Sequence, residues 1–279
     1  MTRAPVNKII PLSLVDGPGN RTSIFLQGCN VSCAYCHNPE TQAVCNHCGI
    51  CVSGCPSGAL TIVDSRVKWD PEICTLCDQC IKVCLTFASP RVKNMSPEEV
   101  FQEIQKNIPF IRGITVSGGE CTLYPNFLKE LFAIANENGL TCLIDSNGTT
   151  DFSRFPELMQ LCNGVMLDVK AWDEQIYKKL TVGPTNSIVK KNLQYLADCN
   201  KLEELRIVCL PGEVDAEAVI SGIAQTIDEK TGRVRLKLIK FRRYGVKGRL
   251  QNTPSPDDIY MQKLLQHAVG FGFEKAVIV

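Results

Sequence analysis

Cysteines crowd into one short part of this chain and limit what it can fold into. The 279-residue sequence holds 16 cysteines, of which eleven lie between Cys29 and Cys84. The N-terminal stretch has Pro, Asn and Asp where a secretion signal needs an unbroken apolar segment. No apolar run approaches the ~20 residues of a membrane helix. We therefore expect a cytoplasmic protein, in which clustered cysteines serve metal or redox chemistry rather than disulfides.

A repeat of 29 residues organises eight of these cysteines. The runs "CNHCGICVSGC" from residue 45 and "CTLCDQCIKVC" from residue 74 both follow C-x2-C-x2-C-x3-C, the spacing of bacterial ferredoxins. The first three thiolates of such a run bind one iron–sulfur cubane, and the fourth binds the other. The spacing therefore predicts two [4Fe–4S] clusters, one on Cys45, Cys48, Cys51 and Cys84, the other on Cys74, Cys77, Cys80 and Cys55. A pair of zinc sites is the alternative, although zinc pairs usually show two CxxC knuckles with a longer spacer.

The remaining clustered cysteines form a shorter array. The stretch "CNVSCAYC" places Cys29, Cys33 and Cys36 in a C-x3-C-x2-C pattern with no fourth thiol. Three thiolates on a four-iron cubane leave one iron without a protein ligand. An open metal position is how a catalytic site binds substrate, as in three-ligand zinc enzymes. The pattern therefore predicts a catalytic cluster.

Outside the cysteine repeat, apolar strands alternate with helices. Strands are predicted at 21–27, 113–117, 140–146, 164–170, 204–211 and 233–241, with a short last strand at 275–279. A helix is expected after Ser96, with Pro97 in its first turn and Glu99 completing a capping box. Six strand–helix units predict a parallel sheet covered by helices. We expect an α/β fold, a partial (β/α)6 barrel of residues 1–38 and 93–279, interrupted by a ferredoxin-like insert at 39–92.

Polar motifs follow several of these strands. Cys29 comes after the first, "SGGE" (117–120) after the second and "DSNG" (145–148) after the third, while Asp168 and Lys170 end the fourth. In parallel α/β folds, chemistry gathers at the carboxyl ends of the strands. We therefore expect these side chains to share one site.

Two of these motifs resemble a known superfamily. "CNVSCAYC", with the aromatic Tyr35 before its last cysteine, resembles the signature of radical S-adenosylmethionine (SAM) enzymes, and "SGGE" resembles their GGE motif. The resemblance implies that the open iron binds the amino and carboxylate groups of SAM. An electron from the cluster then cleaves SAM to methionine and a 5′-deoxyadenosyl radical. Gly118, Gly119 and Glu120 would shape the SAM pocket, because residues without a Cβ let the backbone approach SAM closely.

A longer stretch resembles one particular family within this superfamily. "VDGPGNRTSIFLQGCNVSCAYCHNPET" is similar to the signature of glycyl-radical-enzyme activases, and "DSNG" and "VMLDVK" are similar to further activase segments. The likeness covers nearly the whole chain, and the insert makes it most like the three-cluster, YjjW-type activases. By this resemblance Asp145 and Lys170 hold the amino-acid part of SAM, Asp168 joins a nearby polar or cation site, Arg206 lies in a further binding segment, and Asp16 meets the incoming glycine loop.

The implied function is activation of a glycyl radical enzyme by removal of a glycine Cα hydrogen. The cofactors would be SAM and three [4Fe–4S] clusters, the two in the insert relaying or storing electrons, and oxygen sensitivity is expected. A flavodoxin or ferredoxin-type protein would supply the electron. Two alternatives are a radical SAM enzyme with a small-molecule substrate and a noncatalytic ferredoxin-like electron carrier, which would leave "CNVSCAYC" and "SGGE" unexplained.

Several features carry weaker signals. The net charge of +1 gives no reason to expect nucleic acid or an anionic membrane as a partner. The basic segment "KFRRYGVKGR" (240–249) is a solvated face or a docking patch for an acidic electron donor. It has Phe241 and Arg242 where many activases have an aromatic–His pair. The five isolated cysteines are expected to be small buried hydrophobes: Cys121, Cys142, Cys162, Cys199 and Cys209.

Overall fold

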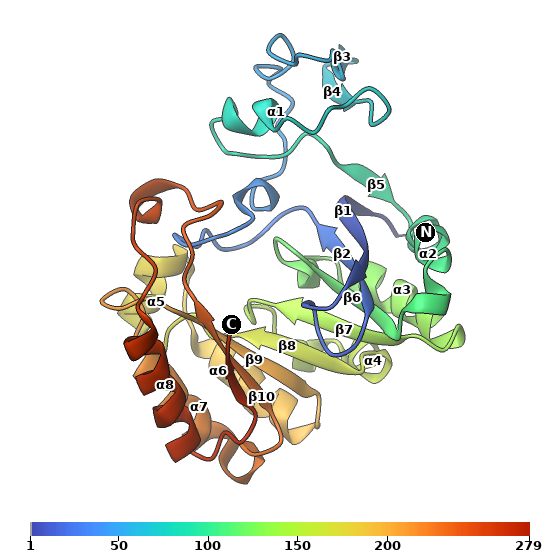
Figure 1. The fold of residues 1–279 in the computed structure, drawn as a ribbon. Coiled ribbons are helices and arrows are strands. Elements are labelled where there is room, and N and C mark those ends of the chain that lie inside the picture. Colours follow the sequence, from blue (N-terminus) through green and yellow to red (C-terminus); the bar gives the residue numbers. More distant parts are fainter. Residues whose placement is uncertain (1) are drawn as a thin grey trace.

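A nine-stranded sheet forms the body of the computed structural model, which describes residues 2–279 (Figure 1). The strands follow the spatial order β11-β10-β9-β8-β7-β6-β2-β1-β5. Their bounds are β1 (Ala4–Ser13), β2 (Arg21–Leu26), β5 (Lys93–Met95), β6 (Gly113–Gly118), β7 (Thr141–Ser146), β8 (Gly164–Asp168), β9 (Leu202–Cys209), β10 (Arg235–Lys240) and β11 (Ala276–Ile278).

Seven neighbouring strands, β2 and β6 through β11, pair in parallel. Helices connect them and cover the outer face of the curved sheet (Figure 1). The helices are α2 (Pro97–Gln105), α3 (Pro125–Glu137), α4 (Pro156–Leu161), α5 (Glu174–Thr181), α6 (Ser187–Asp198), α7 (Ala216–Ile227) and α8 (Asp258–Gly270). The predicted parallel α/β sheet of six strand–helix units is therefore confirmed.

Local sequence signals set the helix ends. The Ser96 hydroxyl accepts from the Glu99 N–H (3.3 Å), and the Glu99 carboxylate accepts from the Ser96 N–H (2.8 Å), which confirms the capping box of α2. α3 begins at Pro125, and Gly139 follows its end with φ +75°. Glycine adopts this left-handed conformation without the cost of a Cβ.

Two strands of this sheet were not predicted. β1 pairs antiparallel with β2, and β5 pairs antiparallel with β1. The sequence of β1, "APVNKIIPLS", contains two prolines, which lack a donor for the sheet, and its pairing with β2 has irregular register. Prolines are tolerated in this strand because it lies near the sheet margin. The strand was not predicted because its sequence gives no clear alternation of apolar and polar residues.

The insert (residues 39–92) projects from the end of the sheet where β2 stops (Figure 1). It contains a hairpin of β3 (Leu60–Val63) and β4 (Arg66–Trp69) and one short helix, α1 (Gln79–Lys82). The first residues of the insert contact the barrel: Gly28 N–H donates to Thr41 O and Cys29 N–H to Gln42 O, both at 2.8 Å. The domain bounds predicted above stay a prediction.

None of the helices within residues 2–279 combines the length and the apolar content that crossing a bilayer requires.

Candidate active site

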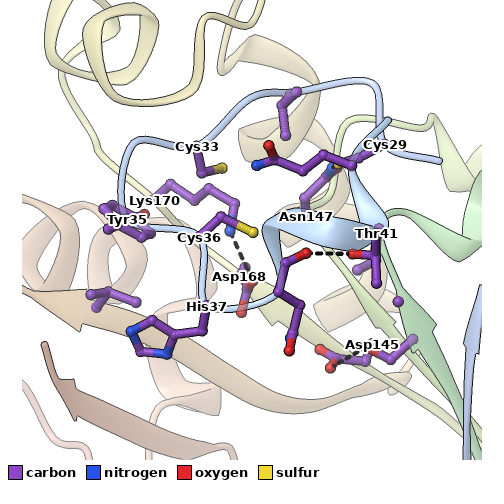
Figure 2. Close-up of a pocket in the computed structure, with 18 of the residues that line it drawn as sticks. Cys29, Cys33, Tyr35, Cys36, His37, Thr41, Asp145, Asn147, Asp168 and Lys170 are labelled. Carbon is purple, nitrogen blue, oxygen red and sulfur yellow. Dashed lines mark hydrogen bonds and ion pairs between the residues drawn. The ribbon is translucent and has the colours of Figure 1, made fainter. Parts of the chain in front are cut away.

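A cavity of about 250 Å³ opens at the carboxyl ends of the parallel strands (Figure 2). The cysteine loop (residues 29–36) and the residues just after it form one wall, and residues near the ends of β6, β7, β8, β9 and β10 line the other sides. Ten of the predicted site residues line this cavity: Cys29, Cys33, Tyr35, Cys36, Gly118, Gly119, Asp145, Asp168, Lys170 and Arg206. The parallel topology therefore brings together motifs that lie far apart in the sequence.

Backbone hydrogen bonds hold the cysteine loop against the barrel. Ser32 N–H donates to Thr181 O (2.6 Å) and Ala34 N–H to Leu180 O (2.7 Å), both at the end of α5. Because the contacts at Gly28 and Cys29 fix the other end, the loop is attached on both sides. The three thiols are thus presented by a firmly held backbone rather than a free loop.

The two glycines of "SGGE" bring the end of β6 into close contact with the end of β2 and with Gly28, just before the cysteine loop. A Cβ on Gly118, where φ is +121°, would lie 2.1 Å from Leu26 O, and one on Gly119 would lie 2.2 Å from Gly28 O. Both glycines also line the cavity. The missing side chains are therefore required by the approach of two protein backbones, a physical reason that the sequence did not suggest.

The Glu120 side chain points away from the cavity and is surrounded by hydrogen-bond donors. The buried carboxylate accepts from the hydroxyls of Thr122 (2.6 Å) and Ser146 (2.9 Å) and from the Asn147 N–H (2.7 Å). It is not among the residues that line the cavity. Glu120 therefore ties the turn after β6 to the turn after β7, and its effect on the site runs through Asn147.

A chain of charges forms one side of the cavity and continues below it. Arg206 binds Asp145 (2.9 Å) and Glu204 (2.6 Å), and Glu204 also accepts from Lys237 Nζ at 3.0 Å. Burial raises the pKa of Asp145, while the charge of Arg206 acts to lower it. Glu204 and Lys237 were not predicted. Glu204 lies two residues before Arg206 in β9, and Lys237 pairs with Arg206 in the register of β10 and β9. A charged residue at each of these strand positions is the only signal that the sequence offers.

Lys170 brings a buried positive charge to the cysteines. Its amine binds Asp168 at 2.9 Å and lies 5.8 Å from the centre of the Tyr35 ring (Figure 2). Burial raises the pKa of the Cys29 and Cys33 thiols to about 11 and also raises that of Cys36, whereas the Lys170 charge lowers all three. A cation at this place favours thiolates, the form in which cysteine binds iron.

The Tyr35 hydroxyl also indicates that a polar group binds in this cavity. It is buried at the cavity wall, and within residues 2–279 it has no hydrogen-bond partner. Buried hydroxyls are rarely left without a partner. Three thiols, a cation and an unpaired donor around one cavity fit a negatively charged cluster with a polar ligand beside it.

Asp16 and Arg21 lie further down the barrel. Asp16 accepts from Ser13 Oγ (2.6 Å) and Ser23 Oγ (2.8 Å), and it does not line the cavity. Ser23 sits two residues along β2 from Phe25, which pairs with Ser117 of the cavity wall, so the residue that binds Asp16 lies about 7 Å further along the strand from that wall. The buried Arg21 donates to backbone oxygens of Ile114 (2.7 Å) and Thr141 (2.8 Å), a structural role.

Asn147 is a cavity residue that the sequence analysis did not single out. Its side-chain amide donates to Asn30 Oδ1 (3.1 Å) and lies 3.7 Å from Cys29 Sγ. Its presence in the "DSNG" motif after a strand was an available signal. Through Asn147, the turn after β7 contacts the cysteine loop directly.

The insert has a small cavity of its own. It is about 20 Å³ in volume, and Cys55, Cys74, Cys77 and Cys80 all line it. Over the described residues, no three His, Cys, Asp or Glu side chains gather closely enough to hold a single metal ion. A cubane differs from such a site because it distributes its thiolates over separate irons.

Four of the five isolated cysteines are buried as expected: Cys121, Cys142, Cys162 and Cys209. The prediction was wrong for Cys199, which is exposed directly after α6.

Comparison with known families shows the superfamily to which this chain belongs. Residues 23–221, from β2 into α7, match the Radical SAM superfamily. The solved structure of QueE from Escherichia coli has a similar fold, with a TM-score of 0.58 at 15% identity over 99% of this chain and 94% of that one. The chain thus belongs to the radical SAM superfamily, so its cofactors are SAM and a [4Fe–4S] cluster.

Curated relatives place it within that superfamily. The 4-hydroxyphenylacetate decarboxylase activating enzyme of Clostridioides difficile is 30% identical over 84% of this chain and 80% of its own length. The indoleacetate decarboxylase activating enzyme of Tractidigestivibacter scatoligenes is 29% identical over 94% and 93%. The chain belongs to the glycyl-radical enzyme activating enzymes. It is a radical SAM enzyme that acts on a glycyl radical enzyme as its protein partner.

Proposed function

We propose that the cavity at the strand ends is where this activating enzyme binds SAM, beside a [4Fe–4S] cluster held by Cys29, Cys33 and Cys36. One observation carries the proposal: these three thiols share a single cavity with polar groups from β6, β7, β8 and β9. When bound, the cluster and SAM supply reductive cleavage of SAM to methionine and a 5′-deoxyadenosyl radical, which removes a glycine Cα hydrogen.

Charged side chains at the cavity suit the two ends of an amino acid. Lys170 would bind the carboxylate of SAM, while Asp145 and Asp168 offer oxygens to its ammonium group. Arg206, held by Asp145 and Glu204, would keep Asp145 ionised and oriented. Tyr35 has an unpaired hydroxyl available to the ligand among the residues that the structure covers. Gly118, Gly119 and Glu120 would fix the loops around this pocket rather than contact its ligand through side chains.

The glycine loop of the partner would reach the cavity from the open side of the sheet. β5 and β11 are the two edge strands, so the curved sheet has a gap through which a loop can enter. Asp16, partly exposed below the cavity wall, would then meet that loop. Its two serine contacts hold the carboxylate in one orientation.

The insert would carry two further [4Fe–4S] clusters, giving three in all and a chain of the YjjW type. The lining of the small cavity supports the predicted exchange of ligands between the two runs, because Cys55 of the first run lies with three cysteines of the second. We assign Cys45, Cys48, Cys51 and Cys84 to the other cluster by the same repeat. Both clusters would store or relay electrons.

A basic hollow beside the cysteine loop offers a place for the electron donor. This hollow, of about 930 Å³, is separate from the two cavities described above. It is bordered by Cys29, Cys33 and Cys36 on one side and by Lys179, Lys247 and Arg249 on another. One carboxylate, that of Glu213, binds both Lys179 (3.5 Å) and Arg249 (2.7 Å). Because the rim has three cations beside this single anion, it keeps a net positive charge. An acidic flavodoxin or ferredoxin-type protein in the cytoplasm fits such a surface.

The test is 5′-deoxyadenosine production from SAM by anaerobically reconstituted, reduced protein. We expect product from the unaltered chain and from Cys199→Ala, an exposed cysteine outside the motifs, and none from Cys33→Ala. Product from Cys33→Ala at the unaltered rate would refute the assignment of the catalytic cluster. Adding a glycyl radical enzyme and recording its radical by electron paramagnetic resonance (EPR) then identifies the partner.

A further inference from the structure

The 29-residue repeat places different side chains at matching positions of the two cluster loops. Gly49 and Ile62 of the first half correspond to Asp78 and Arg91 of the second. The Ile62 side chain packs over Gly49, 2.9 Å from where a Cβ would stand. At the corresponding place, the Arg91 guanidinium forms an ion pair with Asp78. An apolar contact in one half is therefore a charged contact in the other.

Arg91 is the inner member of this ion pair. Its side chain is 16% exposed and that of Asp78 is 55% exposed, so water screens the carboxylate more than the guanidinium. Arg91 also lines the small cavity together with the four cysteines assigned to the second cluster. The pair therefore directs its positive end toward the sulfurs.

Trp69 adds a neutral donor to the same cavity. Its indole Nε1–H is buried and has no hydrogen-bond partner within residues 2–279. A buried N–H without an acceptor is costly, which points to an acceptor that binds in the cavity. Trp69, Arg91 and Cys74 all line this cavity, so a cluster bound there would have both donors beside it.

The first loop lacks a matching arrangement. His47 Nδ1 accepts from the Val67 N–H (3.2 Å), so this nitrogen has no proton to donate to Cys45 Sγ, 3.9 Å away. Cys51 of this loop is buried in a cluster with the apolar side chains of Leu60 and Val67. Where the second loop has a guanidinium, this loop has Ile62.

We propose that Arg91 and Trp69 raise the reduction potential of the cluster on Cys55, Cys74, Cys77 and Cys80 above that of its partner in the insert, which makes it the first electron acceptor of the two. The inference rests on the proposed cluster content. Reduction adds one electron, delivered by a one-electron donor, with no bond formed or broken. The added negative charge is stabilised by a nearby cation and by N–H donors to the sulfurs, which are known determinants of cluster potential.

The experiment is an EPR-monitored redox titration of the full chain with dithionite. A C29A/C33A/C36A background removes the catalytic cluster and leaves the two of the insert. Arg91→Ile copies the first half of the repeat. We expect it to shift the higher-potential wave negative by at least a tenfold change in the reduction constant, 59 mV for one electron, and to leave the other wave in place. Trp69→Phe should shift the same wave less.

Two variants keep the interpretation sharp. Arg66→Ile removes an equal charge from an exposed position of β4 and should move neither wave, while Arg91→Lys should keep most of the potential. Unchanged waves in Arg91→Ile, or an equal shift in Arg66→Ile, would overturn the inference alone. A background protein that holds no reducible cluster would overturn the proposed cluster content and this inference together.

Discussion

The barrel and the insert hold cysteines in different ways. In the barrel, one continuous core lies between the sheet and its helices, with fully buried residues such as Ile24, Ile144 and Leu205. The core of the insert consists of Cys51, Leu60 and Val67, with a few partly buried neighbours. A segment of this size cannot bury enough apolar surface to be stable alone. The proposed clusters would therefore supply much of the stability of the insert, whereas the barrel supplies a preformed frame for its three cysteines.

This difference suits the two tasks proposed for the cysteines. The cysteine loop has backbone hydrogen bonds to α5, and Gly28 just before it is in close contact with Gly119, so the position of the loop would not depend on the cluster. Three cysteines of the insert, Cys51, Cys55 and Cys80, belong to its small core. With the proposed clusters, folding and cluster binding would be separate events in the barrel and coupled events in the insert.

Iron removal should have the largest effect. We expect chelation under reducing conditions to abolish amide-exchange protection in the β3–β4 hairpin, because the proposed clusters would take the place of a large hydrophobic core there. Protection in β7 and β8 should remain. Hydrogen exchange with mass spectrometry measures both regions in one sample. A hairpin that stays protected without iron would mean that its few apolar contacts suffice.

Truncation of a core leucine should separate the two regions by stability. Leu205→Ala, at a fully buried position of β9, should lower the free energy of unfolding of the barrel by about 2–5 kcal/mol. Leu60→Ala in the insert should leave that transition unchanged, because the insert opens independently. Urea titrations followed by circular dichroism measure the transition. Equal losses from the two variants would show that barrel and insert unfold as one unit.

A pair of glycine substitutions tests whether the barrel preforms the cysteine loop. Gly118→Ala places a Cβ 2.1 Å from Leu26 O at a φ of +121°, a strain of about 1–3 kcal/mol. We expect a large loss of 5′-deoxyadenosine production, since β6 must move away from the end of β2, which leads into the cysteine loop. Gly139→Ala, also left-handed but with open space around it, is the control and should keep its activity. Full activity in Gly118→Ala would show that the contact is not needed.

The junction between the regions should show the smallest effect. Ser96→Ala removes the cap of α2, just after the insert rejoins the barrel at β5, and should cost about 1 kcal/mol. Ser96→Asn keeps a capping oxygen and should retain most of the stability that Ser96→Ala loses. Thermal unfolding measures the change, and the redox potentials of the insert should not respond. A shift in those potentials would indicate that the two regions are coupled through this helix.

Much of the site could be predicted because spacing and topology act together. The cysteine spacings alone indicated which thiols belong together, and strand periodicity placed "SGGE", "DSNG" and Lys170 after parallel strands. Parallel strands end at one edge, so the side chains converge. Glu204 and Lys237 could not be found in this way, because a single charged residue in a strand gives no sign of the partner it will meet across the sheet.

The sequence by itself determined the parallel strand–helix units and the edge at which their polar motifs meet, and it predicted the cysteine sets, because these follow from periodicity and from short spacings along one chain. Only the tertiary structure decided where Glu120 points, why Gly118 must lack a side chain, and that Arg91 and Trp69 line one cavity with Cys74. Each of these depends on an approach between segments distant in sequence, at distances of a few ångströms. Such contacts are set by the packing of the whole fold, and no local pattern records them.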